Sequence, residues 1–587
     1  MPDLRLRRLA SLAAALALSA AGAAAAEMPP VPHYLGSESC VACHADASAA
    51  WAGSDHGLAW TEPTPANVLG DFDDASFDRQ GVVTRFTRRG DAYVVETEDG
   101  AGQRRSFDVT GVAGIHPLQQ YLVSPAPGRT QALDIAWDTE RRQWYDLYPD
   151  QVLPPGDGLH WTGPYKSWEA RCAECHATGY SRRYDTATRS YAPEMAEKGV
   201  GCEACHGPGE AHAAWAAAPG AYDAAAWPGL TAHGLTVDLA GSAEAQIQQC
   251  AGCHSRREAF VDGNPLPGTP YHDSYNLALL REGTYYADGQ IDAEDYEYGS
   301  FLQARMYAQG VRCSDCHEPH SMQLRAEGNA VCTQCHSPAG NDRFPTLRKA
   351  LYDDPSHHFH TADTPAAECK SCHMPEKTYM GIDRRRDHGF RVPRPDLDAE
   401  TGAPDTCTSC HTDRDPAWAA AELAARFPES THRGAHFSTA LAAARRDPAA
   451  RADELVALAG QPDLAGIVRA TALDLLVPVA DPSIADRTAP LLADPDPLVR
   501  ATAAALQRGV PDGAARLERL APTLADPLRS VRIAGAKAML GADPAAAPAA
   551  ERAALADASA EWQRALASQI DFPETNMQVG GAALASR

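Results

Sequence analysis

The stretch from Cys313 to His336 reads CSDCHEPHSMQLRAEGNAVCTQCH and holds two C-x-x-C-H units. C-x-x-C-H is the attachment signature of c-type haem, in which both cysteine thiols bond to the porphyrin and the adjacent histidine ligates the iron. Two attachment sites this close in sequence leave no room for a separate protein core around each haem. The sequence therefore predicts haems that pack against one another, and packed haems exchange electrons.

Every one of the 16 cysteines belongs to such a unit, which makes eight C-x-x-C-H motifs. C-x-x-C is also half of a zinc knuckle, but a zinc site needs no histidine directly after the second cysteine. No cysteine remains for zinc or for a disulfide, so we expect eight covalently bound haem c groups as cofactors. The predicted attachment residues are Cys40, Cys43, Cys172, Cys175, Cys202, Cys205, Cys250, Cys253, Cys313, Cys316, Cys332, Cys335, Cys369, Cys372, Cys407 and Cys410. The predicted proximal iron ligands are His44, His176, His206, His254, His317, His336, His373 and His411.

The balance of charged residues restricts the possible partners. The net charge is −25 at pH 7, and haem propionates would make the protein more acidic. This charge argues against nucleic acid and against an anionic membrane surface, and it permits docking to basic redox partner proteins.

The N-terminus has the pattern of an export signal. Basic residues within 5–8 precede an apolar run at 9–21 and an A-x-A cleavage pattern at 24–26. The apolar run is too short to span a bilayer, and no later run is long enough for a transmembrane helix. We therefore expect a signal peptide over 1–26, cleaved after Ala26, and a periplasmic or otherwise exported protein; the alternative is an uncleaved anchor.

The rest of the chain divides into three expected regions. Residues 27–115 form an N-terminal haem module, with a small antiparallel β meander over 81–110 suggested by alternating apolar residues and turn signals. Residues 116–415 form a multihaem cytochrome c domain of short helices between many Gly, Pro and Asp turns. The expected fold class is mainly α with long irregular segments. Residues 27–415 provide about 49 residues per haem, so porphyrins must supply much of the core, and the apoprotein should be largely unfolded.

Residues 416–587 contain a repeated helical pattern. Val468-Arg469-Ala470, Val499-Arg500-Ala501 and Val531-Arg532-Ile533 follow one another at intervals of 31 and 32 residues. Apolar positions recur at helical spacing around each copy, which predicts an α-solenoid of HEAT-like helical hairpins. Such a domain serves either as a structural cap on the haem region or as a docking surface, and the pattern favours neither. The tail after Asp571 is expected to be loose.

An iron with one histidine either takes a second protein ligand or keeps an open site. Fourteen histidines lie outside the motifs, which is more than the eight distal positions require. For each of them the alternative is a surface or propionate-binding role. In the His-His-Phe-His run at 357–360, two of the three histidines could ligate different irons. The predicted distal ligands are His56, His160, His212, His272, His320, His358, His360 and His388.

Several longer stretches resemble a known family. The run YLGSESCVACH with Trp51 and His56 resembles the haem modules of the cytochrome c-554 type. WTGPYKSWEARCAECHATGY, VGCEACHGPGEAH, YGSFLQARMYAQGVRCSDCHEPHS and RRDHGFRVPRPDL are similar to exported multihaem cytochromes with doubled C-x-x-C-H motifs. The resemblance covers roughly residues 33–415. It implies covalent haem, mostly bis-histidine irons and periplasmic electron transfer, and it supports the eight distal histidines named above.

These observations favour an electron-transfer protein with no catalytic residue. The alternative is a multihaem oxidoreductase that acts on small nitrogen or sulfur compounds at one five-coordinate haem; the absence of a C-x-x-C-K motif removes one signature of nitrite-reducing sites. A third hypothesis is a structural or sensory protein in which haem only stabilises the fold.

Overall fold

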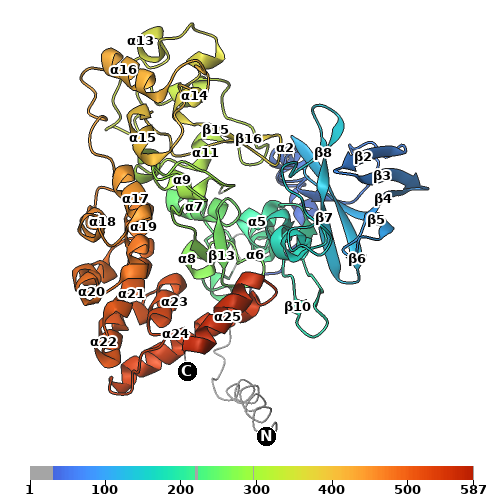
Figure 1. Ribbon diagram of the computed structural model, residues 1–587. Helices are drawn as coiled ribbons and strands as arrows, with labels where there is room; N and C mark the ends of the chain where they lie inside the picture. Colours follow the sequence, from blue (N-terminus) through green and yellow to red (C-terminus); the bar gives the residue numbers. More distant parts are fainter. Residues whose placement is uncertain (1–30, 219–222, 295, 586–587) are drawn as a thin grey trace.

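The computed structural model describes residues 31–218, 223–294 and 296–585. The predicted signal peptide lies outside the described residues. A β-sheet forms one side of the molecule, an array of helices forms the opposite side, and the C-x-x-C-H motifs lie on short helices and turns between them (Figure 1). The structure is therefore mixed α and β, and the mainly α class that we expected is too narrow.

The sheet is an antiparallel meander of consecutive strands, to which β1 adds by pairing with β5. Its strands are β1 (Trp60–Thr61), β2 (Ala75–Arg79), β3 (Val82–Arg89), β4 (Ala92–Glu98), β5 (Arg104–Ala113), β6 (Leu118–Ala126), β7 (Arg129–Asp138) and β8 (Gln143–Asp146). The predicted meander is confirmed but continues past residue 115, where we expected the module to end. Shifts of register within β5–β6 and β6–β7 interrupt the alternation of apolar residues, so the later strands are hard to recognise from sequence.

The sheet curls until its first and last strands meet. Arg79 on β2 forms an ion pair with Asp146 on β8, with 2.7 Å between the guanidinium and carboxylate atoms. Inside the curl, the ring of Trp144 stacks on Phe86 with 3.6 Å between ring centres, and Tyr121 is completely buried. The sheet thus has its own core, independent of haem.

The motifs themselves adopt a single helical turn. His44, His254 and His336 each donate a backbone N–H to the carbonyl of the first cysteine of their motif, at 2.9 Å. One turn brings both sulfurs and the imidazole to the same side of the chain, as haem attachment requires. The motif-bearing helices include α4 (Ala173–His176), α5 (Cys202–His206), α7 (Ala243–Ala251), α11 (Cys313–Cys316), α12 (Ala330–Thr333) and α14 (Cys369–His373).

The C-terminal third is an array of helices, most of which pack on the next helix in sequence or on the next but one. Its helices are α16 (Pro416–Arg426), α17 (Phe437–Arg446), α18 (Ala452–Ala459), α19 (Gly466–Leu476), α20 (Pro482–Thr488), α21 (Pro497–Leu506), α22 (Gly513–Leu524), α23 (Arg529–Ala538), α24 (Ala549–Ser568) and α25 (Pro573–Ala585). Asp481, Asp496 and Asp512 accept hydrogen bonds from the first turn of the helices that follow them, which explains where these helices begin. The tail after Asp571, which we expected to be loose, forms α25.

The repeated Val-Arg pairs have a structural role. Val468, Val499 and Val531 are buried between helices. The arginine that follows each valine forms an ion pair with a carboxylate 25 to 29 residues further along the chain. The pairs are Arg469–Asp494, Arg500–Asp526 and Arg532–Glu561. The first two pairs each connect one copy of the pattern to the next, and the third connects the last copy to α24.

Replacement of Arg500 by alanine should destabilise the helical array by about 3–5 kcal/mol, because it leaves Asp526 buried without its partner. The two side chains are only 13% and 8% exposed and lie 2.7 Å apart. Urea unfolding followed by circular dichroism measures the loss. The matched control is Arg487→Ala, whose partner Asp453 is 94% exposed, and it should cost less than about 1 kcal/mol. Equal losses in the two variants would contradict the role of the buried pair.

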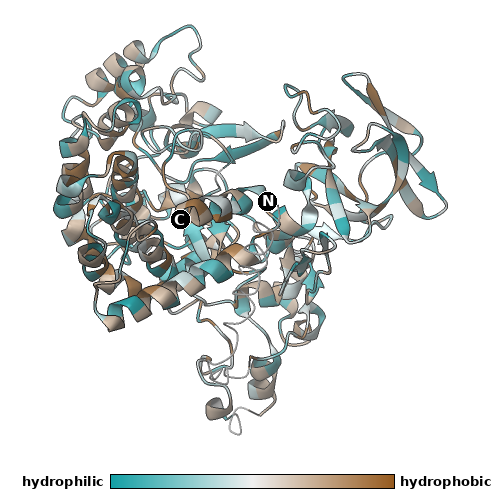
Figure 2. Ribbon diagram, turned by 60° about the horizontal axis from the view of Figure 1, so that its bottom comes forward, coloured by the Kyte–Doolittle hydropathy of each residue, from teal (hydrophilic) through white to brown (hydrophobic). Residues whose placement is uncertain are grey.

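Hydrophilic and hydrophobic residues alternate along the helices (Figure 2). Among the residues that the structure describes, no helix combines the length and the apolar composition needed to cross a membrane.

Candidate haem sites

A continuous hollow of about 3330 Å³ runs through the middle of the molecule. Cysteines or histidines of seven of the eight motifs line it, together with apolar residues such as Phe301, Phe344 and Leu351. None of the 16 cysteines, all of which lie in the described residues, forms a disulfide. A space of this size lined by attachment cysteines fits a set of packed porphyrins, so these residues suit the predicted cofactor. The eighth motif, Cys172 to His176, lies beside this hollow, where Ala177 and Gly179 form part of the wall.

Histidines from distant parts of the chain face one another in pairs. A metal–imidazole bond of about 2 Å on each side, plus the distance from each nitrogen to its ring centre, separates two axial imidazoles by roughly 6 Å. Five pairs that each contain one motif histidine have ring centres 6.1 to 6.3 Å apart. They are His44–His212, His254–His56, His317–His388, His373–His357 and His411–His360. In addition, burial, and then the nearby His320, lower the pKa of His206, so His320 lies in the neighbourhood of a sixth motif histidine.

Hydrogen bonds fix which ring nitrogen is available to an iron. Nδ1 of His176 lies 2.8 Å from the carbonyl of Ala59, and Nδ1 of His373 lies 2.7 Å from the carbonyl of Arg391. Because a carbonyl only accepts, Nδ1 carries the proton and Nε2 remains free for the metal. Nδ1 of His254 instead bonds to the Glu297 carboxylate at 3.0 Å. Burial opposes ionisation of Glu297, but the hydrogen bond from His254 prevails and lowers the pKa of Glu297 to about 2.

Five of the predicted distal histidines, namely His56, His212, His320, His360 and His388, lie beside motif histidines. The structure places His358 elsewhere and brings His357, which we did not select, opposite His373. His357 and His358 are consecutive residues of helix α13 (Pro355–His358), so their side chains point about 100° apart. Which of the two faces His373 depends on the orientation of the helix, and local sequence does not give that orientation.

Two further predicted ligands, His160 and His272, do not face a motif histidine ring in the part of the chain that the structure describes. His160 is buried beside the sheet, where its Nδ1 lies 2.8 Å from the hydroxyl of Thr162. His272 packs edge-on against Tyr271. Burial, and to a lesser degree Arg500, lowers the pKa of His272 to about 4, so it stays neutral at pH 7. Local sequence did not indicate that these two histidines lie apart from the paired rings.

The paired histidines predict that alanine substitutions at His388 and at His272 will have different effects on the spin state of the haem iron. Replacement of His388 by alanine should leave the iron held by His317 without its second imidazole and convert one haem from low spin to high spin. Replacement of His272, at the helical array, should leave all haem signals unchanged. Electron paramagnetic resonance of the oxidised protein distinguishes the two results. A new high-spin signal in His272→Ala, or none in His388→Ala, would contradict these pairs.

The proximity of cysteines from different motifs indicates the order of the motifs in space. Cys202 lies near enough to Cys40 to raise its pKa, and Cys313 and Cys369 do the same for Cys250 and Cys332, respectively, together with burial. Smaller electrostatic effects on the pKa show that Cys205 lies near Cys250, Cys335 near Cys316, and Cys410 near Cys372. The motifs thus form a row that starts at Cys40 and runs through Cys202, Cys250, Cys313, Cys332 and Cys369 to Cys407.

The motif of Cys172 branches from this row. Its Cys175 lies near enough to Cys253 to raise the pKa of Cys253, together with burial. Among the described residues, no histidine ring is paired with His176, and the same holds for His336, whose ring contacts Tyr352 edge-on. Tyr296 lies near the branch: burial, and then nearby charges that include Cys175 and Cys172, raise its pKa. Its φ of 58° is rare for an aromatic residue, and it lines a cavity of about 210 Å³ with Lys377 and Arg385.

Two protein-family models match parts of this chain. Residues 162–207 match the family model of cytochrome c554 and c-prime, and residues 306–341 match the model of the doubled CXXCH motif. These findings, with the motifs and paired imidazoles, define a multihaem c-type cytochrome. The crystal structure of outer cell wall cytochrome OcwA is similar over 81% of this chain and 99% of that chain, with 18% identity and a TM-score of 0.47. Among curated proteins, none is significantly similar in sequence.

Proposed function

We propose that this protein is an exported octahaem c-type cytochrome that conducts electrons along a row of mostly bis-histidine haems. The observation that carries the proposal is the set of opposed imidazoles with centres 6.1 to 6.3 Å apart, arranged on motifs whose thiols adjoin. Two imidazoles make an iron low-spin and suited to electron transfer. The export signal expected at the N-terminus supports a periplasmic or extracellular location.

The ends of the row are the suitable points for electron entry and exit. Of the 16 cysteines, the two that are exposed are Cys43 and Cys410, in the first and last motifs of the row. Near Cys43, Glu38, Asp46 and Asp55 are exposed, and residues 33–62 contain no lysine or arginine. This charge suits a redox partner with a basic surface. The C-terminal helices act as a HEAT-like cap on the haem region.

Haem analysis and paramagnetic resonance test the proposal together. Purified holoprotein should contain eight thioether-linked haems per chain, and most of its oxidised iron should give low-spin signals. A protein with fewer haems, or with high-spin signals from most irons, would contradict it.

The arrangement at the branch favours a second candidate function, reduction or oxidation of a small nitrogen or sulfur compound. The observation is that His176 faces no second imidazole among the described residues, while Tyr296 and Arg385 lie close to its motif. An open iron position beside proton donors permits such chemistry. Addition of cyanide should perturb a high-spin signal that disappears in a Cys172→Ala/Cys175→Ala variant, and assays with nitrite, hydroxylamine and tetrathionate then test for turnover. Cyanide without effect would exclude this function.

A further inference from the structure

The chain between α24 and α25 lies against the motif that forms the branch. The ring of Phe572 is held between two guanidinium groups, 4.0 Å from that of Arg171 and 4.8 Å from that of Arg182. Arg171 immediately precedes Cys172, and Arg182 lies six residues after His176. One aromatic ring from the C-terminus therefore contacts both ends of the loop that carries this haem motif.

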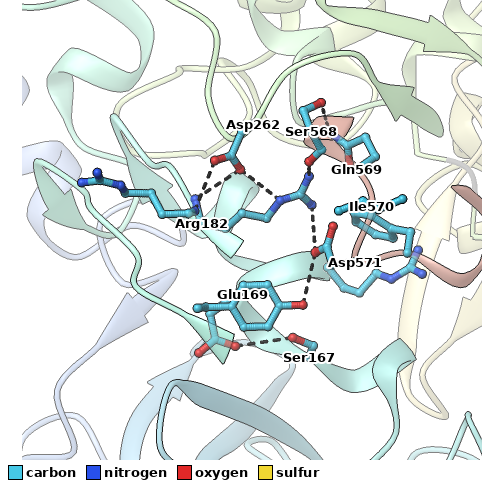
Figure 3. A network of polar contacts seen from close by, with 12 residues as sticks. Ser167, Glu169, Arg182, Asp262, Ser568, Gln569, Ile570 and Asp571 are labelled. Carbon is cyan, nitrogen blue, oxygen red and sulfur yellow. Dashed lines mark hydrogen bonds and ion pairs between the residues drawn. The ribbon is translucent and has the colours of Figure 1, made fainter. Parts of the chain in front are cut away.

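The contacts around Arg182 are buried and charged. The Arg182 side chain is 5% exposed and pairs with Asp262 at 3.0 Å and with Asp571 at 3.4 Å; the Asp571 side chain is 1% exposed. Arg182 also donates to the carbonyl of Ser568, and the figure shows these groups converging on its guanidinium (Figure 3). A buried arginine needs such partners, because the desolvation of an unpaired charge is costly. The loop and the C-terminal segment therefore fix each other's position.

Two additional contacts hold the segment in place. Gln569 donates from Nε2 to the carbonyl of Val261 at 2.6 Å, and Glu574 pairs with Arg171 at 3.1 Å. Val261 lies two residues after the strand β13 (Arg257–Ala259). On this strand, the guanidinium of Arg257 forms an ion pair with the carboxylate of Glu174, which lies inside the Cys172 motif, at 2.8 Å. The C-terminal segment thus contacts both the motif loop and the chain that follows β13, the strand whose Arg257 is paired with that loop.

The helical array is also anchored to the haem region at a second place. The backbone N–H of Leu280 donates to the Thr471 hydroxyl at 3.1 Å, and Arg281 pairs with Asp474 at 2.9 Å. Asp474 lies in α19, whereas Phe572 lies just before α25. Because the array is fixed to the haem region at both places, it restricts the movement of the motif between Arg171 and Arg182.

We propose that residues 568–574 position the haem held by Cys172, Cys175 and His176, and that the C-terminal helices serve as a brace for this haem. The inference rests on the haem attachment given under the proposed function. Phe572, Asp571 and Arg182 are positioning residues, since they act through the motif loop. A haem ligand that is oriented by surrounding contacts changes its properties when those contacts are lost.

The test compares Phe572→Ala with Phe572→Tyr, which keeps an aromatic ring between the arginines, and with Met577→Ala, whose side chain is 79% exposed on α25. All are measured as full-length holoprotein by potentiometric titration with paramagnetic resonance, and by hydrogen exchange. The signal of the branch haem is identified by its loss in Cys172→Ala/Cys175→Ala. In Phe572→Ala this signal and its potential should shift, and amides within 166–182 should exchange on the order of tenfold faster. Phe572→Tyr and Met577→Ala should resemble the wild type.

Two outcomes would overturn the inference. In the first, Phe572→Ala increases exchange only within 549–585 and leaves the branch haem unchanged. In the second, all haem signals shift together, which would indicate general loosening. If the wild type lacks a haem at Cys172, the proposed function fails instead, so the two failures are distinguishable.

Discussion

Protein that has not received haem is expected to lack a stable fold over residues 306–415, while the sheet and the C-terminal helices remain folded. The motifs of this region surround a hollow of about 3330 Å³, which porphyrins must fill. Without them, short helices such as α11 and α12 have too little apolar contact to stay together. Hydrogen exchange on apoprotein should therefore show near-complete loss of protection over 306–415.

Two regions of the same chain provide internal controls. Strands β2–β8 enclose a core around Phe86 and Tyr121, and helices α19–α23 enclose one around Leu473 and Leu506; neither requires haem. Residues 271–304 share the core of the helices through Leu280 and should keep part of their protection. Equal protection of 306–415 in apoprotein and holoprotein would contradict the role of haem as core.

Removal of the haem held by Cys250 and Cys253 is expected to interrupt electron passage between the two ends of the row. This motif adjoins those of Cys202 and Cys313 and also the branch at Cys175. Because the eight proposed haems would use all 16 cysteines, an Asp46→Cys substitution would offer a unique thiol for a light-activated ruthenium complex. Electrons injected there should reach the far haem at Cys407 in the intact row.

In a Cys250→Ala/Cys253→Ala variant, the injected electrons should remain on the haems of the Cys40 and Cys202 motifs. Transient absorption, with the haems resolved by their potentials, measures how far reduction spreads. The matched control is Cys172→Ala/Cys175→Ala, which removes the branch haem and should leave passage to Cys407 intact. Undiminished passage in the first variant, or equal interruption in both, would show that the row has another order.

Local features of this protein could be predicted from sequence because each depends on a few adjacent residues. A C-x-x-C-H motif closes one helical turn by itself, as the bond from His254 to Cys250 shows. The Val-Arg repeats mark helices whose apolar face lies on one side, and Val499 is buried accordingly. The β meander over 81–110 was visible from alternating residues, whereas the register shifts after Val109 concealed its continuation.

The distal side of each iron could be predicted only in part. His56 and His254 are 198 positions apart in the chain, yet their rings face each other. His272 and His160 have equally suitable sequence contexts, but the fold buries them next to Tyr271 and Thr162. Local sequence carries no information about which distant segment will arrive opposite a given ring.

The sequence by itself predicted the chemistry: which residues would attach haem, which histidine of each motif would ligate iron, and where helices repeat. Only the tertiary structure decided the order of the motifs, the branch at Cys175, the lack of an opposing histidine ring at His176 among the described residues, and the contact of Phe572 with Arg171 and Arg182. The physical reason is the range of the interactions. Covalent attachment and helical turns involve neighbours in the chain, whereas axial pairing and buried ion pairs join segments that only long-range packing brings together.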